Sequence, residues 1–166
     1  MTFSPLRCII AGALAALAAL PAPSSAGAAL ADSPFAQLAG SWSGSGQVIL
    51  ADGKSERLSC RGYYLLKDDG EGLGLAIRCA SPAYKLDLRS ALRYEGGRIS
   101  GSWEERTFNA VGSVSGRAAG GSLNLAITGG GLNGSMSISY GGAQQAVSIT
   151  AEGVGFKGVS MRLSRS

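Results

Sequence analysis

The chain has 166 residues, a formal net charge of +4 at pH 7 and no histidine. The lack of histidine excludes Ser-His-Asp and Cys-His nucleophile activation, together with haem and zinc sites built on imidazole ligands. The positive charge is mild, so it does not by itself indicate a nucleic-acid-binding protein.

The first 31 residues have the layout of a secretory signal peptide. Arg7 supplies a basic start, residues 8–20 form an unbroken apolar run, and prolines and small residues follow. The run is too short for a bilayer span, which takes about 20 residues. We expect cleavage after Ala31, or alternatively after Ala28, and release into the periplasm or the medium. An uncleaved N-terminal anchor is the other interpretation.

Residues 32–39 are expected to form an N-terminal tail, followed by one domain at 40–166 that is large enough for a hydrophobic core. Apolar and polar residues alternate through most of that domain, for example at 84–95 and 122–128. This period of two is typical of strands that are buried on one face. The expected strands are 41–50, 55–66, 72–80, 84–94, 98–107, 111–117, 122–128, 133–140, 145–151 and 157–164.

Short glycine-rich links separate these strands, so each strand is expected to pair with the next one along the chain. The product is an antiparallel up-and-down meander. A meander of about 8–10 strands with one apolar face leaves no free edge if it closes on itself. We therefore predict an all-β fold, with the meander closed into a barrel.

Cys60 and Cys79 lie at nearly equal distances from the Asp69-Gly70 step. A hairpin that turns there places the two cysteines opposite each other, both on the apolar face of their strands. Export would provide an oxidising compartment, which favours a Cys60–Cys79 disulfide. Two buried free thiols are the alternative.

Two other hairpins predict specific cross-strand neighbours. A tight turn at Gly96-Gly97 pairs Leu92 with Gly101 and Ser90 with Trp103, so that large residues face small ones. A three-residue loop at 52–54 pairs Trp42 with Tyr64 and Gly46 with Cys60. These sets give register predictions that a structure can contradict.

Several aromatic residues fall on the inward face of the predicted strands. They could line an apolar pocket, or they could simply fill a small barrel. Strict alternation also turns Glu105 inward, where a carboxylate needs a partner and could contact a cationic or hydroxylated ligand; a strand end that turns it outward is the alternative. The candidate ligand-binding residues are Trp42, Tyr64, Tyr94, Trp103, Glu105 and Tyr140.

No residue is assigned to catalysis or to a metal, and no cofactor is expected. The run Gly153–Gly158 matches Gly-x-Gly-x-x-Gly, but no helix follows that could hold a phosphate. Basic residues concentrate between Ser55 and Arg106. A solvated polar face explains them most simply, although such a flank could also meet an acidic partner or anionic lipid headgroups.

The segment LAGSWSGSG at 38–46 resembles the first strand of the calycin superfamily, which includes the lipocalins and nitrobindin-like barrels. Gly40 and Trp42 match the Gly-x-Trp signature of that strand, in which the tryptophan closes one end of the barrel. The resemblance implies a calycin-like barrel. Haem binding of the nitrobindin type is not implied, because this chain has no axial histidine.

The signal peptide, the Gly-x-Trp strand and the single disulfide are also similar to small periplasmic protease inhibitors of Gram-negative bacteria. In that family the N-terminal tail enters the protease cleft, and the corresponding segment here is 32–36. We expect an exported, non-enzymatic protein that holds a small apolar or amphipathic ligand in its barrel. An interaction protein or hydrolase inhibitor that acts through its tail or rim is the alternative. Neither nucleic acid nor a transmembrane span is expected.

Overall fold

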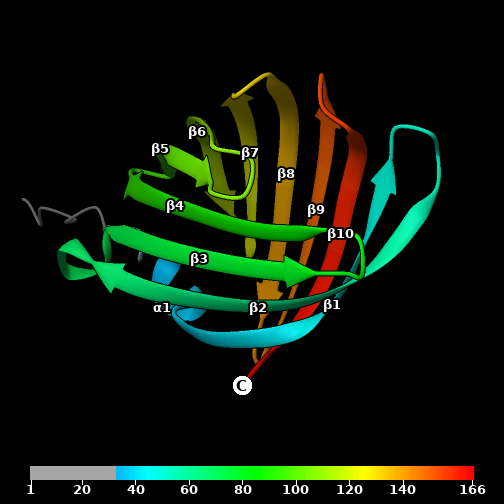
Figure 1. Ribbon diagram of the computed structural model, residues 1–166. Helices are drawn as coiled ribbons and strands as arrows, with labels where there is room; N and C mark the ends of the chain where they lie inside the picture. Colours follow the sequence, from blue (N-terminus) through cyan, green and yellow to red (C-terminus); the bar gives the residue numbers. More distant parts are fainter. Residues whose placement is uncertain (1–32) are drawn as a thin grey trace, which may run out of the picture.

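Alternating apolar residues and glycine turns produce ten consecutive antiparallel strands in the computed structural model, which describes residues 33–166 (Figure 1). The first strand pairs with the last, so the all-β, closed-barrel prediction is confirmed. The predicted signal peptide lies outside the described residues. The elements are α1 (Phe35–Leu38), β1 (Gly40–Leu50), β2 (Ser55–Lys67), η1 (Asp68–Gly70), β3 (Gly72–Ala80), β4 (Lys85–Glu95), β5 (Arg98–Glu105), β6 (Ala110–Ala119), β7 (Ser122–Gly129), β8 (Leu132–Gly141), β9 (Gln144–Glu152) and β10 (Phe156–Arg165).

The segment expected to be a tail forms a short helix instead. Helix α1 contacts β2 and β8 and therefore lies across one end of the barrel. Phe35 and Leu38 are 0% and 1% exposed, because they fill the space between the strand ends. No helix within residues 33–166 is long and apolar enough to cross a membrane. Phe35 and Leu38 therefore hold α1 in place by packing, although its four residues are too few to show a helical period in the sequence.

The meander gives the barrel two different ends. The end that α1 covers, here called the plugged end, also holds the β2–β3, β4–β5, β6–β7 and β8–β9 turns. The opposite end, here called the distal end, holds the other five turns. Side chains that are 2% exposed or less gather toward the plugged end, and they include Trp42, Leu73, Ile99, Leu123 and Leu163.

The register predictions are confirmed for two hairpins and wrong for one. Cys60 pairs with Cys79, and Leu92 pairs with Gly101 across a turn in which Gly96 and Gly97 have φ of 54° and 84°. Such positive φ values suit the tight hairpin turns that match strand twist.

The first hairpin is shifted by two residues, so Trp42 pairs with Gly62 rather than with Tyr64. Its loop is 51–53, because the amide of Leu50 donates to the carbonyl of Lys54 at 2.8 Å. Asp52 sits in the middle of the loop and accepts from the Lys54 amide at 3.0 Å. A shift of two leaves every side chain on its predicted face.

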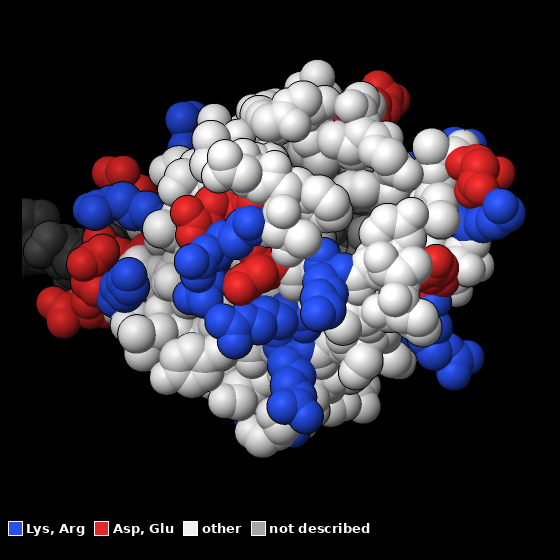
Figure 2. All heavy atoms as spheres, viewed as in Figure 1, with Lys and Arg blue, Asp and Glu red and all other residues white. Residues whose placement is uncertain are grey.

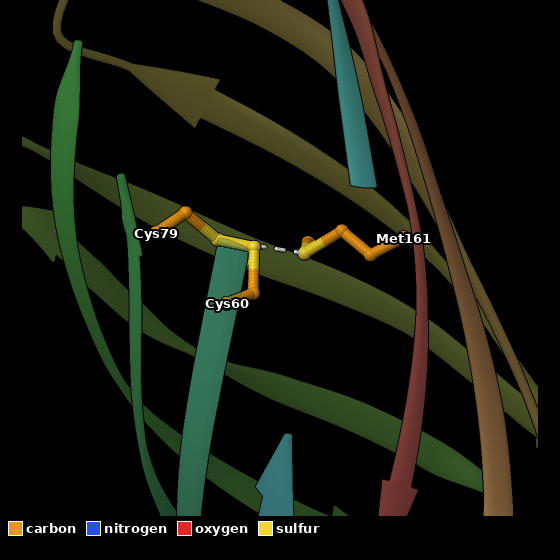
Figure 3. Close-up of a disulfide and its surroundings, with 3 residues drawn as sticks. All are labelled: Cys60, Cys79 and Met161. Atoms are coloured by element: carbon orange, nitrogen blue, oxygen red, sulfur yellow. Dashed lines mark hydrogen bonds between the residues drawn. A yellow bond between two sulfur atoms is a disulfide. The ribbon is translucent and has the colours of Figure 1, made fainter. Parts of the chain in front are cut away.

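The predicted disulfide is present between Cys60 and Cys79, whose Cα atoms are 4.1 Å apart. The Cys79 Sγ also lies 3.7 Å from the Met161 Sδ of β10 (Figure 3). A disulfide sulfur carries no proton, so this is a packing contact. The three sulfurs form a buried layer between the plugged end and the distal end, here called the sulfur layer.

Glu105 faces inward at the end of β5, as strict alternation predicts, and it is 6% exposed. Its Oε1 accepts from the backbone amide of Asp87 at 2.7 Å, and its Oε2 accepts from the amide of Phe108 at 2.7 Å. The carboxylate therefore ties the start of β4 to the β5–β6 turn. Hydrogen bonds to a charged acceptor of this kind are about twice as strong as neutral ones.

Removing the disulfide should lower the free energy of unfolding by about 3 kcal/mol, because it releases a closed loop of this length in the unfolded chain. The variant combines Cys60→Ala with Cys79→Ala, and urea unfolding followed by tryptophan emission measures the change. Under reducing conditions the native chain should fall to the value of the variant. Equal stability of the two proteins under oxidising conditions would contradict the stabilising role.

Glu105→Ala should lower the free energy of unfolding by about 3 kcal/mol, because two buried amide donors lose a charged acceptor. Its neighbour Glu104 is exposed and points outward, so Glu104→Ala should change stability by less than about 0.5 kcal/mol. Urea unfolding of both variants makes the comparison. Similar values for the two would show that the buried carboxylate is not a structural tie.

Candidate functional site

Trp42 closes the plugged end of the barrel. Its Nε1 donates to the carbonyl of Leu38 in α1 at 2.8 Å, and its ring lies 6.4 Å from that of Tyr64. On the other side of α1, the ring of Phe35 meets Tyr94 edge-on at 6.2 Å. These two aromatic pairs thus pack around the helix and plug this end of the barrel.

Arg165, at the end of β10, covers Trp42 from outside. Its guanidinium lies 4.5 Å from the centre of the Trp42 ring, in a cation–π arrangement. It also donates to the carbonyls of Gln37 (2.7 Å) and Ala39, at the end of α1. Arg165 satisfies helix carbonyls that lack partners within the helix. Arg165 was not among the residues predicted from sequence, although it shares the inward parity of Leu163.

A second polar contact lies inside the plug, between β2 and β9. The Tyr64 hydroxyl donates to the Oε1 of Gln145 at 3.4 Å, and burial raises the pKa of Tyr64 to about 12. The Gln145 Nε2 is buried without a hydrogen-bond partner among residues 33–166. Burial, with a smaller contribution from Tyr94, also raises the pKa of the half-buried Tyr140.

At the distal end, Trp103 is half-buried, and its position is set by glycines. Its Nε1 donates to the carbonyl of Thr128 at 3.2 Å. A Cβ on Gly112 would lie 2.5 Å from this nitrogen, and one on Gly130 would lie 3.3 Å from the far edge of the indole. The two glycines therefore leave the space in which the indole lies.

The structure therefore divides the six predicted ligand-binding residues between the two ends. Trp42, Tyr64, Tyr94 and Tyr140 lie at the plugged end, and only Trp103 and Glu105 lie toward the distal end. Glu105 has both carboxylate oxygens occupied by backbone amides. Whether any of the six contacts a ligand stays a prediction.

The inward face of the distal half is only partly covered by other side chains. Six inward-facing apolar residues on β4, β5, β8, β9 and β10 pack against the core there and remain partly exposed. Their inward direction follows from the pairing registers, which place them on the same face as Cys79 or Met161. This set, the distal apolar ring, consists of Leu86, Leu88, Trp103, Met136, Ile149 and Val159.

The outer wall carries two open grooves, which differ from the ring in chemistry. One of about 390 Å³ lies along β8–β10 near the plugged end, and one of about 350 Å³ lies along β7–β9. Serine, glutamine, asparagine and threonine supply much of their lining. Among residues 33–166 no three histidine, cysteine or acidic side chains gather as a metal site would require.

No protein-family model and no curated protein matches the chain. Solved structures do match its fold. Rv2717c from Mycobacterium tuberculosis aligns with a TM-score of 0.59 and 15% identity, over 80% of this chain and 94% of that one. The S-type phycobiliprotein lyase CPES from Guillardia theta aligns with a TM-score of 0.58 and 11% identity, over 80% and 90%.

A protein of unknown function from the DUF3598 family of Nostoc punctiforme aligns with a TM-score of 0.57 and 13% identity. That alignment covers 80% of this chain and 48% of the other. At such low identity these likenesses establish a shared fold and nothing about a shared ligand or reaction. The chain is similar in fold to small ten-stranded barrels, which is consistent with the calycin-like resemblance.

Proposed function

We propose that the protein is an exported, non-enzymatic binding protein that takes a small apolar or amphipathic ligand at the distal end of its barrel. The observation that carries this proposal is the distal apolar ring, whose members point inward and yet remain partly exposed to water. The most deeply buried side chains lie toward the plugged end, whereas these six lie toward the distal end. The ring thus offers apolar surface that a ligand can remove from water.

The two halves of the barrel favour entry from the distal side. Helix α1 and Arg165 cover the other end, and the sulfur layer lies between. An apolar ligand held against the ring gains about 25 cal/mol for each Å² of apolar surface that it covers. Trp103 adds a flat aromatic face held by its bond to Thr128.

Export is supported by the disulfide and by the expected signal peptide. One protein of similar fold is named a phycobiliprotein lyase, which supports a binding role only at the level of the barrel. We propose binding without catalysis, because the sequence has no histidine, the commonest general base at neutral pH.

The inhibitor alternative receives less support. Its tail segment, 32–36, includes Phe35, which is 0% exposed. Entry of this segment into a protease cleft would require Phe35 to leave the plug and to lose its contact with Tyr94. An interaction through the barrel rim needs no such rearrangement.

The proposal predicts that a brominated fatty acid quenches the emission of Trp103, because bromine must come close to the indole. Trp42 is the only other tryptophan and is 1% exposed, so the Trp103→Phe variant should show little quenching. Leu88→Gln places an amide in the distal apolar ring and should weaken binding roughly tenfold.

The matched control is Leu65→Gln, which makes the same change at an exposed, outward position on β2. It should leave the affinity unchanged within about twofold, as expected for a surface site outside the ring. Equal effects of the two leucine variants, or saturable binding with no quenching of Trp103, would contradict a site at the distal end.

A further inference from the structure

The outer wall over β2–β5 gathers the excess positive charge of the molecule. Figure 2 shows blue side chains clustered over β2–β4 around an enclosed red group. The strand residues among them point outward by parity, Arg106 lies in the β5–β6 turn, and all but the partly buried Arg89 and Asp87 are exposed. The set, here called the basic face, consists of Arg57, Arg61, Arg78, Lys85, Arg89 and Arg106, with the acids Asp87 and Glu104.

The charge balance distinguishes the basic face from the rest of the surface. It holds six cations and two acids, whereas the remainder of residues 33–166 holds eight cations and eight acids. The net charge of the basic face therefore equals that of the whole described chain, and the remaining charges cancel. A merely solvated exterior would not need such segregation, since interspersed charges of both signs keep a protein soluble equally well.

Internal ion pairs neutralise only a small part of this charge. Asp87 pairs with Arg78 at 3.3 Å and with Arg89 at 3.2 Å. Partial burial would raise the pKa of Asp87, but the bond from Arg89 and the charges of both arginines hold it below its usual range. Asp87 thus stays ionised and orders two guanidinium groups. No ion pair within residues 33–166 engages Arg57, Arg61 or Lys85.

Exposed apolar side chains border the basic face. Tyr63 follows Arg61 on the outer side of β2 and is 56% exposed, and Tyr84 directly precedes Lys85. Phe108 and Val111, at 65% and 64%, lie beyond Arg106 and opposite Glu104. A protein–protein interface has an apolar centre and a polar rim. This wall has the reverse arrangement, with cations at the centre and apolar groups at the edge.

We propose that the basic face docks the protein on the surface of a bilayer that contains anionic phospholipids. Guanidinium groups bind phosphate oxygens in pairs, and aromatic rings at the border suit the headgroup depth, where one side is apolar and the other wet. Lys85 and Arg106 extend the face to the distal turns. Docking would therefore hold the distal end beside the bilayer. The docking itself does not depend on the proposed ligand.

Sedimentation with vesicles tests this docking on the full-length chain. The readout is the ratio of partition coefficients on mixed phosphatidylcholine–phosphatidylglycerol vesicles and on phosphatidylcholine alone. Any insertion of the apolar run at 8–20 contributes to both partition coefficients and is the same in every variant, so it cancels in the ratio. We expect a ratio well above one at low salt, which falls toward one as salt screens the attraction.

The decisive variant combines Arg61→Gln with Arg78→Gln, two residues that lie directly opposite each other on β2 and β3. It should lower the ratio at least about tenfold, because each basic residue near an anionic surface adds to the attraction. The chain offers a matched control, because Arg98 and Arg117 are also directly opposite, on β5 and β6 outside the basic face. Converting both of these to Gln makes the same charge change and should lower the ratio by less than about threefold.

Equal losses in the two double variants would overturn the proposal, because net charge alone would then explain the binding. A ratio of one for the native chain would overturn it as well. Complete displacement from mixed vesicles by an equal charge of duplex DNA would assign the face to a soluble polyanion instead.

Tyr63→Ser removes a border ring without a change of charge. It should lower partitioning on mixed vesicles about threefold, which keeps the test informative if the arginine variants unfold.

Discussion

The alternation of side chains across a closed wall is the constraint on which the remaining features depend. In each strand, every second residue points into the barrel, and closure between β1 and β10 leaves no edge where this rule could relax. One face of each strand therefore holds the core, the sulfurs and Glu105, and on β2–β4 the other face holds the arginines of the basic face. The same chain thus presents an apolar interior and a charged exterior with no second layer.

The two ends of the barrel use the interior differently. At the plugged end, α1, Trp42 and Arg165 exclude water and satisfy the helix carbonyls. At the distal end, the inward residues lie on strands that end in short turns, and the distal apolar ring remains partly exposed. A stable core and an accessible apolar surface can coexist in one small barrel because they lie toward opposite ends of it.

Features that follow from local pattern could be predicted from sequence, and features that need distant contacts could not. The strands, the Gly96-Gly97 turn, the Cys60–Cys79 pairing and the direction of Glu105 all follow from parity and turn chemistry.

Helix α1 was not predicted, because its four residues are held by tertiary packing rather than by helical periodicity. The clamp by Arg165 joins residues 126 and 128 positions apart, which no local pattern shows. The predicted register of the first hairpin was wrong by two residues, because an Asp-Gly step can occupy more than one position in a loop and so does not fix where the loop begins. Whether the predicted site residues bind a ligand depends on space left among side chains, which parity does not determine.

The connectivity of the barrel also bears on how it forms. Nine of the ten strand pairings join neighbours along the chain and can form as local hairpins, whereas β1 and β10 must meet across more than a hundred residues. Long-range pairing of this kind slows folding, because loop closure precedes the contacts that compensate for it. A chain whose last strand has not yet emerged exposes unpaired backbone on both β1 and β9, where another chain could add a strand. Pairing of β10 (Phe156–Arg165) with β1 and β9 is thus the step that converts an aggregation-prone open sheet into a barrel without edges.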